Sequence, residues 1–157
     1  MQKFQLELFL HIIGIGSASG LLFKGTSLYL VSDNSHILYE YSLVDKKLER
    51  ISVAPEGYKG PRENVPKKEK ADFGAITAMG EELYLFGSGS TDKRNTILHV
   101  DGFTKKAHPP IDATDLYLSM QEFSEINKDN FNIEAAVNEG STWYLFNRGN
   151  GPKGQNG

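Results

Sequence analysis

Three segments of the chain share one pattern of residues, and this pattern constrains the fold more than any other feature of the sequence. They are residues 19–33, 74–88 and 134–148. They align without gaps on Tyr29, Tyr84 and Tyr144, which are 55 and 60 residues apart. Each contains an apolar run, a glycine-containing turn and then a run of aromatic and aliphatic residues, which is typical of a β-hairpin. The sequence therefore predicts three similar antiparallel hairpins.

A further strand is expected soon after each of the first two hairpins, over residues 36–41 and 96–100. Small sheets of three to four strands cannot cover both faces alone, so neighbouring sheets must stack, as the blades of a β-propeller do. We therefore expect an all-β fold, a partial β-propeller of about three antiparallel blades in one domain. The domain covers residues 1–157, with repeat units at about 17–53, 72–108 and 132–157. A β-sandwich with similar hairpins is the alternative.

Residues 1–20 allow two interpretations. Lys3 before an apolar stretch, with small residues at 17–19, is typical of a secretory leader. However, Glu7 and His11 interrupt the stretch, and apolar side chains alternate along it in the two-residue period of a half-buried strand. We favour the strand, and with it a cytoplasmic over a secreted or periplasmic location. No stretch approaches the roughly 18 apolar residues that would span a membrane.

The composition excludes several classes of function. With 17 basic and 20 acidic residues the net charge is −3, which gives no field to attract phosphate backbones, so no nucleic-acid partner is expected. The absence of cysteine excludes disulfides, thiolate zinc sites and a cysteine nucleophile. The glycine-rich residues 14–20 are not followed by the helix of a dinucleotide site. The spacing of the four histidines favours structural roles over metal binding; they are His11, His36, His99 and His108.

The two connectors between the hairpins differ in character. Residues 54–71 hold three prolines and a charged cluster, which indicates a mobile surface loop. Residues 112–127 are the one helical candidate, with Leu116, Met120 and Phe123 at helical spacing. Asp112 or Thr114 is available as its N-cap. We expect the apolar stripe of this helix to pack on a blade.

Several short motifs together resemble an uncharacterised bacterial β-propeller family, a domain of unknown function. They are residues 17–20, 70–77, 87–90, 132–136 and 147–151. The resemblance runs from about residue 4 to 151 and implies a distant similarity to phytase-like and other six-bladed propellers. The family pattern has an acidic residue where this chain has Gly74, whereas Glu134 keeps the acid in the next unit.

The length matches only half of such a ring, since six blades of about 45 residues need roughly 270. A three-blade arc would leave apolar faces and a strand edge exposed. We therefore expect either a truncated gene product or fragment, or self-association in which two chains complete a ring.

Polar residues at equivalent strand ends are the candidate binding residues: Asp33, Asn34, Asp72, Glu134, Asn147 and Arg148. Carboxylate and amide oxygens are ligands that calcium prefers, and arginine suits an anionic group. Turn-capping roles for the same side chains are the alternative. We expect a binding or interaction scaffold for an unknown small molecule or protein, with no cofactor. The alternative is a calcium-dependent hydrolase, lactonase-like or phytase-like, acting on a small ester, lactone or phosphate.

Overall fold

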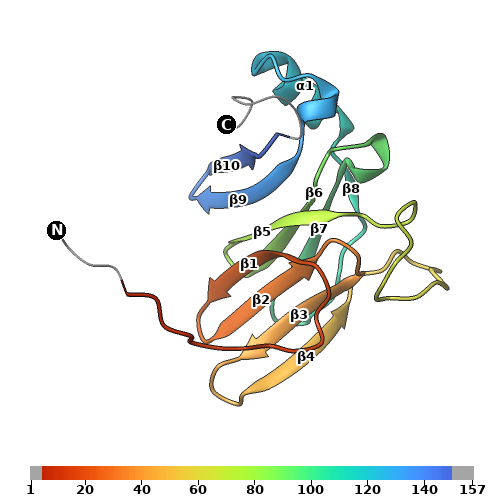
Figure 1. The fold of residues 1–157 in the computed structure, drawn as a ribbon. Helices are drawn as coiled ribbons and strands as arrows, with labels where there is room; N and C mark the ends of the chain where they lie inside the picture. Colours follow the sequence, from red (N-terminus) through yellow and green to blue (C-terminus); the bar gives the residue numbers. More distant parts are fainter. Residues whose placement is uncertain (1–4, 150–157) are drawn as a thin grey trace.

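The computed structural model describes residues 5–149 of the chain and contains three antiparallel sheets (Figure 1). The first sheet has the order β1 (Ala18–Lys24), β2 (Ser27–Ser32), β3 (Ile37–Ser42) and β4 (Lys47–Ser52). The second has the order β5 (Phe73–Met79), β6 (Glu82–Gly87), β7 (Thr96–Asp101) and β8 (Ile111–Asp112). The third contains β9 (Ile133–Glu139) and β10 (Thr142–Asn147). One helix, α1 (Thr114–Phe123), and two short 3₁₀ helices, η1 (Asp92–Arg94) and η2 (Lys128–Asn130), lie in the connectors. The prediction of an all-β fold with one short helix is confirmed.

The three predicted hairpins have the same register. Leu22 pairs with Tyr29, Thr77 with Tyr84 and Val137 with Tyr144. In each hairpin the register shifts once at the open end, which places one bulged residue there; these residues are Ser19, Gly74 and Glu134. The turns have two residues and begin with a glycine at positive φ, namely Gly25, Gly80 and Gly140. Such turns match the natural twist of paired strands, so the sequence defines these hairpins locally.

The first strands of the three hairpins lie side by side, in the order β1, β5, β9 (Figure 1). The Ser19 hydroxyl donates a hydrogen bond to the Phe73 carbonyl at 2.7 Å, which joins the beginnings of β1 and β5. A Cβ atom at Gly74 would lie 2.5 Å from the Ile133 carbonyl oxygen, so β5 and β9 approach closely at the same end. Any side chain at residue 74 would therefore force these two strands apart.

Two hydrophobic cores hold the sheets together, one between the first and second sheets and one between the second and third. Side chains around Tyr29 and Val31 of the first sheet pack on Ile76, Leu83 and Leu85 of the second. On the opposite face of the second sheet, Ala75 and Phe86 pack with residues of the third sheet and with Tyr117 of α1. The second sheet is therefore covered on both faces, whereas the first and third sheets each have one neighbour.

A polar cluster also links the first two sheets. Lys105, which follows β7, lies 2.7 Å from Oε2 of Glu40 on β3 and donates a hydrogen bond to the Tyr29 hydroxyl at 3.1 Å. Tyr29 and Ser27 donate hydrogen bonds to the other carboxylate oxygen of Glu40. Burial raises the pKa of Glu40, but the hydrogen bonds from Lys105, Tyr29 and Ser27 outweigh burial and lower it overall.

The predicted amino-terminal strand is wrong for the described residues 5–17, which form no strand. Leu6 is 99% exposed and Leu8 is 85% exposed, so the alternating apolar residues have no sheet to pair with. Instead this segment passes over the outer face of the first sheet, where Gly14 approaches the Arg50 guanidinium and Ser32 donates a hydrogen bond to the Gly16 carbonyl. A two-residue period is necessary for a half-buried strand, but it does not supply a partner.

The predicted helix is present but shorter, and its apolar stripe does not pack as expected. The buried residue of α1 is Tyr117, whose hydroxyl donates a hydrogen bond to the Gly87 carbonyl at 2.8 Å. Of the predicted stripe, Phe123 is 91% exposed and Leu116 about half exposed, while Met120 is partly buried. The N-cap position is Ala113, and Asp112 accepts a hydrogen bond from the Thr114 backbone N–H.

The connector over residues 54–71 is anchored rather than a simple surface loop. Val65 is buried and its N–H donates a hydrogen bond to the Asn34 carbonyl. The Tyr39 hydroxyl donates a hydrogen bond to Glu63 at 2.6 Å.

Within residues 5–149, no helix is both long and apolar enough to cross a membrane.

Candidate functional site

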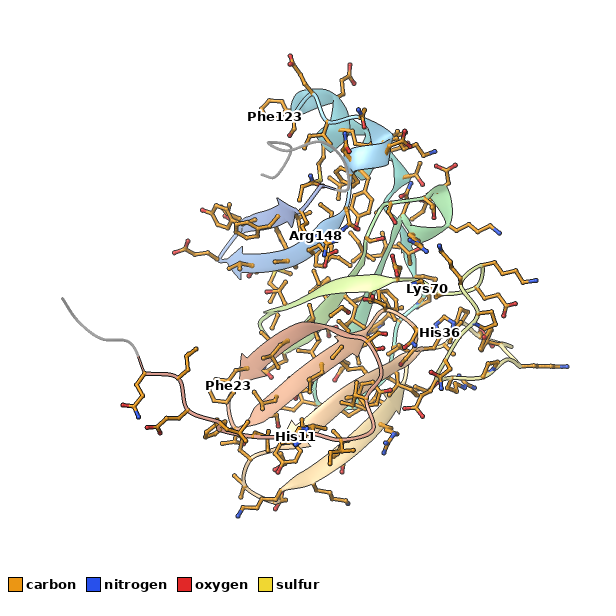
Figure 2. All side chains as sticks on the ribbon, in the orientation of Figure 1. His11, Phe23, His36, Lys70, Phe123 and Arg148 are labelled. Atoms are coloured by element: carbon orange, nitrogen blue, oxygen red, sulfur yellow. The ribbon has the colours of Figure 1, made fainter. Side chains whose placement is uncertain are left out.

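The candidate residues lie at one end of the three sheets, which we call the polar end. There β1, β5 and β9 begin and β2, β6 and β10 finish. The contacts of Ser19 with Phe73 and of Gly74 with Ile133 bring these beginnings together. Figure 2 shows Lys70 close to the beginning of β5. The expectation that equivalent strand ends share one side of the molecule therefore fits the structure.

Asp72 is held by two cations at the polar end. Its Oδ1 lies 2.5 Å from Lys70 Nζ, and its Oδ2 lies 2.8 Å from a guanidinium nitrogen of Arg94. The Ser88 hydroxyl also donates a hydrogen bond to Oδ2 at 2.9 Å. Only 14% of the Asp72 side chain is exposed. Both carboxylate oxygens thus already have strong partners, and this ion pair fastens the connector before β5 to the loop that follows β6.

Glu134, Asn147 and Arg148 form a second cluster. The Asn132 amide donates a hydrogen bond to Glu134 Oε1 at 2.5 Å, and the exposed Arg148 guanidinium lies 3.8 Å from the same oxygen. Asn147 is buried, and its amide oxygen accepts a hydrogen bond from the Asn132 backbone N–H at 2.6 Å. Its amide nitrogen donates to the Asn130 carbonyl. Asn147 therefore fixes the segment that leads into β9.

Asp33 and Asn34 form the turn after β2. The Asn34 side-chain oxygen lies 2.9 Å from the Ser32 hydroxyl, and the backbone N–H of Asp33 donates a hydrogen bond to the Ser17 carbonyl. Within the described residues, no hydrogen bond or ion pair joins this turn to Asp72 or to Glu134. The six candidates thus form three neighbouring clusters, each of which stabilises its own turn or connector.

Two apolar surfaces at the ends of the series of sheets are exposed, as expected from the sequence for a three-blade arc, but the sequence did not indicate which residues form them. The first, which we call the Tyr144 face, belongs to the third sheet and contains Ala135, Val137, Tyr144 and Phe146. Tyr144 and Phe146 are each 47% exposed. In the shared register, the residues equivalent to Tyr144 and Phe146 are Tyr29 and Val31 in the first sheet. Tyr29 and Val31 are buried against the second sheet.

The second surface, which we call the Leu21 face, belongs to the first sheet and contains Leu21, Phe23, Leu28 and Leu30. Leu21 is 63% exposed and Phe23 is 61% exposed. Their equivalents in the second sheet are Ile76 and Ala78, which pack against the first sheet. The alternation along each hairpin could have identified both faces, but which face lacks a cover depends on the order of the sheets in space.

The third sheet also borders an apolar groove of about 800 Å³. Its lining combines Tyr84 and Phe86 of the second sheet, Trp143 and Leu145 of the third, and the exposed stripe of α1. Tyr84 and Trp143 meet edge to face, with ring centroids 4.9 Å apart. The helix stripe predicted to pack on a blade thus forms one wall of this groove instead.

These features define an all-β protein of three stacked antiparallel sheets. Ion pairs and hydrogen bonds join the side chains of its polar end, and the outer faces of its first and third sheets carry exposed apolar residues. The chain belongs to a family of unknown function, DUF6929, whose model matches residues 14–157. A search of curated proteins finds none that matches the sequence. The sequence-based assignment to a family of unknown function is confirmed at this level.

Proposed function

We propose that this protein is a β-propeller-type interaction scaffold, and that it associates head to tail with a second copy of itself. The observation that carries the proposal is the pair of uncovered, complementary faces at the two ends of the series of sheets. Inside the chain, the Tyr29 side of the first sheet packs on the Ile76 side of the second. The Tyr144 face is equivalent to the Tyr29 side, and the Leu21 face is equivalent to the Ile76 side, but within the described residues neither packs on another sheet.

A second copy can cover both faces at once. Its Leu21 face would pack on the Tyr144 face of the first copy, and a two-fold rotation would repeat this contact between the other two ends. Because the arrangement closes, no apolar end face stays exposed. Two chains of three sheets would give six sheets, a number within the usual range for propellers. The amino-terminal segment crosses part of the Leu21 face at Arg50 and Ser32, but Leu21 and Phe23 stay 63% and 61% exposed beside it.

The outer edges of the sheets differ in how well they are protected against pairing with other chains. The outer edge strand of the first sheet, β4, carries Lys47, Glu49 and Arg50, and such charges discourage pairing with other chains. The outer strand of the second sheet, β8, has only two residues. By contrast, β10 carries neither a charge nor a proline, and it has no partner on its outer side among residues 5–149. The outer edge of the third sheet is therefore the least protected against edge-to-edge pairing, a second kind of contact that would coexist with packing on its Tyr144 face.

Paired substitutions on the two faces test the proposal by sedimentation. The double variants Tyr144→Lys/Phe146→Lys and Leu21→Lys/Phe23→Lys should each reduce self-association by at least about tenfold, because they place charges in an apolar contact. Val44→Lys changes another exposed apolar residue, outside both faces, and should associate like the unmodified chain.

Mixing the two double variants gives the sharper result. Each variant retains the face that the other has lost, so a head-to-tail contact predicts that the mixture forms heterodimers through one intact interface. If neither variant alters the mass, or if the mixture shows no more association than the separate variants, the head-to-tail proposal is wrong.

The calcium-dependent hydrolase has less support than the scaffold. Calcium takes six to eight oxygen ligands, whereas the best placed carboxylate, Asp72, already uses both oxygens with Lys70, Arg94 and Ser88. A calcium titration followed by thermal melting distinguishes the two proposals. A ligand bound by the native state must raise the melting temperature, so an unchanged melting temperature at millimolar calcium would count against the hydrolase.

A further inference from the structure

Three side chains with metal-binding chemistry meet on one face of the second sheet. They are Glu82 on β6, His99 on β7 and His108 in the segment after β7. Tyr84, two residues after Glu82, pairs directly with His99. On the other side of β7, the backbone N–H of His108 donates a hydrogen bond to the His99 carbonyl at 2.9 Å. Two paired strands and the segment that folds back beside β7 therefore bring the three side chains together.

The ligand atoms of this cluster converge. His99 Nδ1 lies 3.3 Å from Glu82 Oε2, and His108 Nε2 lies 3.8 Å from the same oxygen. All three atoms lie within 4.8 Å of one another. The imidazole of His99 is stacked between the rings of Tyr84 and His108, with centroid distances of 5.6 and 4.1 Å. This stacking holds the His99 ring in a fixed orientation with Nδ1 towards the carboxylate.

Two of these atoms lack the hydrogen bonds that buried polar atoms normally make. Glu82 Oε2 and His99 Nδ1 are inaccessible to solvent and have no hydrogen-bond partner within residues 5–149. They are close to each other but not aligned for a hydrogen bond. An unpaired buried polar atom costs about 1 to 3 kcal/mol, so two at one place require an explanation. A cation between them would satisfy both.

We propose that Glu82, His99 and His108 bind a divalent transition metal, with Zn²⁺ the best chemical match. Two imidazole nitrogens and one carboxylate oxygen are one of the usual ligand sets of a zinc site that keeps an open fourth position. Tetrahedral zinc with bonds of about 2.0 to 2.1 Å sets its ligand atoms about 3.3 Å apart. The His99 to Glu82 distance already equals this separation. His108 has to move by up to about 1.5 Å, because its nitrogen lies 3.8 Å from the Glu82 oxygen and within 4.8 Å of the His99 nitrogen. The His108 side chain is 43% exposed, so it can make this movement and leave the fourth position open to solvent.

Calorimetry on the metal-free full-length chain tests the site directly. After treatment with EDTA and transfer to chelator-free buffer near neutral pH, titration with ZnCl₂ should show one Zn²⁺ per chain. The melting temperature should rise by about 5 to 10 °C at a Zn²⁺ concentration about a hundred times Kd. Replacement with Co²⁺ should give the visible absorption of a four- or five-coordinate site.

Substitutions distinguish this site from adventitious binding. His99→Asn, His108→Asn and Glu82→Gln should each weaken Zn²⁺ binding by more than about tenfold and remove the Co²⁺ absorption. His11→Asn, which changes an exposed histidine elsewhere, should bind Zn²⁺ like the unmodified chain. Far-UV circular dichroism of the metal-free variants shows whether they fold. Zn²⁺ binding that is unchanged in a folded His99→Asn/His108→Asn variant would overturn the proposal, as would no stabilisation of the unmodified chain. Tyr144→Lys/Phe146→Lys should keep the metal, so the result does not depend on self-association.

Discussion

Replacement of Gly74 by alanine tests the close contact between β5 and β9 that sets the sheets side by side. An added Cβ would lie 2.5 Å from the Ile133 carbonyl oxygen, a separation that real Cβ atoms essentially never show. Ordinary contact is about 3.5 Å, so the two strands would have to separate by roughly 1 Å. The obstacle is backbone, not a flexible side chain, so it cannot rotate away. Insertion of an extra carbon into such a packed place costs about 1 to 3 kcal/mol.

For a domain of this size, a loss of about 2 kcal/mol lowers the melting temperature by about 4 to 8 °C. Differential scanning calorimetry at one fixed protein concentration measures the shift. Gly16→Ala is the matched control, because its Cβ would meet only the Asn34 side chain at 3.8 Å and should change the free energy of unfolding by less than about 0.5 kcal/mol. Equal melting temperatures for the two variants would refute the direct backbone contact between the second and third sheets.

Three further predictions concern buried polar groups. Burial lowers the pKa of His36 below its ordinary value of 6.5. Near that pH the unfolded chain therefore binds a proton at His36 more readily than the folded chain does, and the free energy of unfolding falls as the pH drops through 6.5. His36→Phe should reduce this slope by up to about 1.4 kcal/mol per pH unit in denaturant titrations, and parallel curves would contradict the prediction. The lowered pKa of Glu40 makes its contribution fully present above 4.5 and lost at lower pH. Glu40→Gln, which leaves the partly buried Lys105 without its counter-charge, should cost about 2 to 4 kcal/mol near neutral pH and reduce the loss of stability in acid; an unchanged urea midpoint would show that the Glu40–Lys105 ion pair contributes nothing. Tyr117→Phe removes one buried hydrogen bond to Gly87 and should cost about 0.5 to 1.5 kcal/mol by thermal melting, whereas no change would show that the bond contributes nothing.

The hairpins could be predicted from the sequence because their determinants are local. Gly25, Gly80 and Gly140 each start a two-residue turn at positive φ, and the flanking residues alternate on both sides. A two-residue turn fixes the pairing register, and register decides which face every side chain occupies. The equivalence of Tyr29, Tyr84 and Tyr144 in register therefore follows from the sequence alone.

The amino-terminal segment and the helix show where local patterns are insufficient. The alternation before Leu10 resembles a strand, but a strand also needs a neighbour with free backbone groups, and the local sequence does not reveal one. In α1 the spacing of Leu116, Met120 and Phe123 predicts an apolar stripe correctly, while the anchor is Tyr117 on another side of the helix. Tyr117 is buried because its hydroxyl bonds the Gly87 carbonyl, a tertiary contact that the local sequence does not reveal.

The placement of the candidate residues, though not their binding role, could be predicted in part, because it also depends on tertiary contacts. Equivalent ends of the hairpins do gather at one end, but the partners of Asp72, which are Lys70, Arg94 and Ser88, come from connectors that have no common pattern. The histidine cluster could not be recognised from helical ligand spacing, because His99 and His108 do not share a helix. His99 and His108 are cross-strand neighbours on either side of a turn at residues 102–105, and a search for residues symmetric about a turn would have paired them.

The molar mass of the unmodified chain in solution tests the central claim most directly. Light scattering over a range of protein concentrations should show a species of twice 17.5 kDa, about 35 kDa, that dissociates on dilution. No larger species should form, because the head-to-tail contact closes after two copies. A mass of 17.5 kDa at every concentration, together with a cooperative melt, would contradict the proposal that a second copy covers the Tyr144 and Leu21 faces.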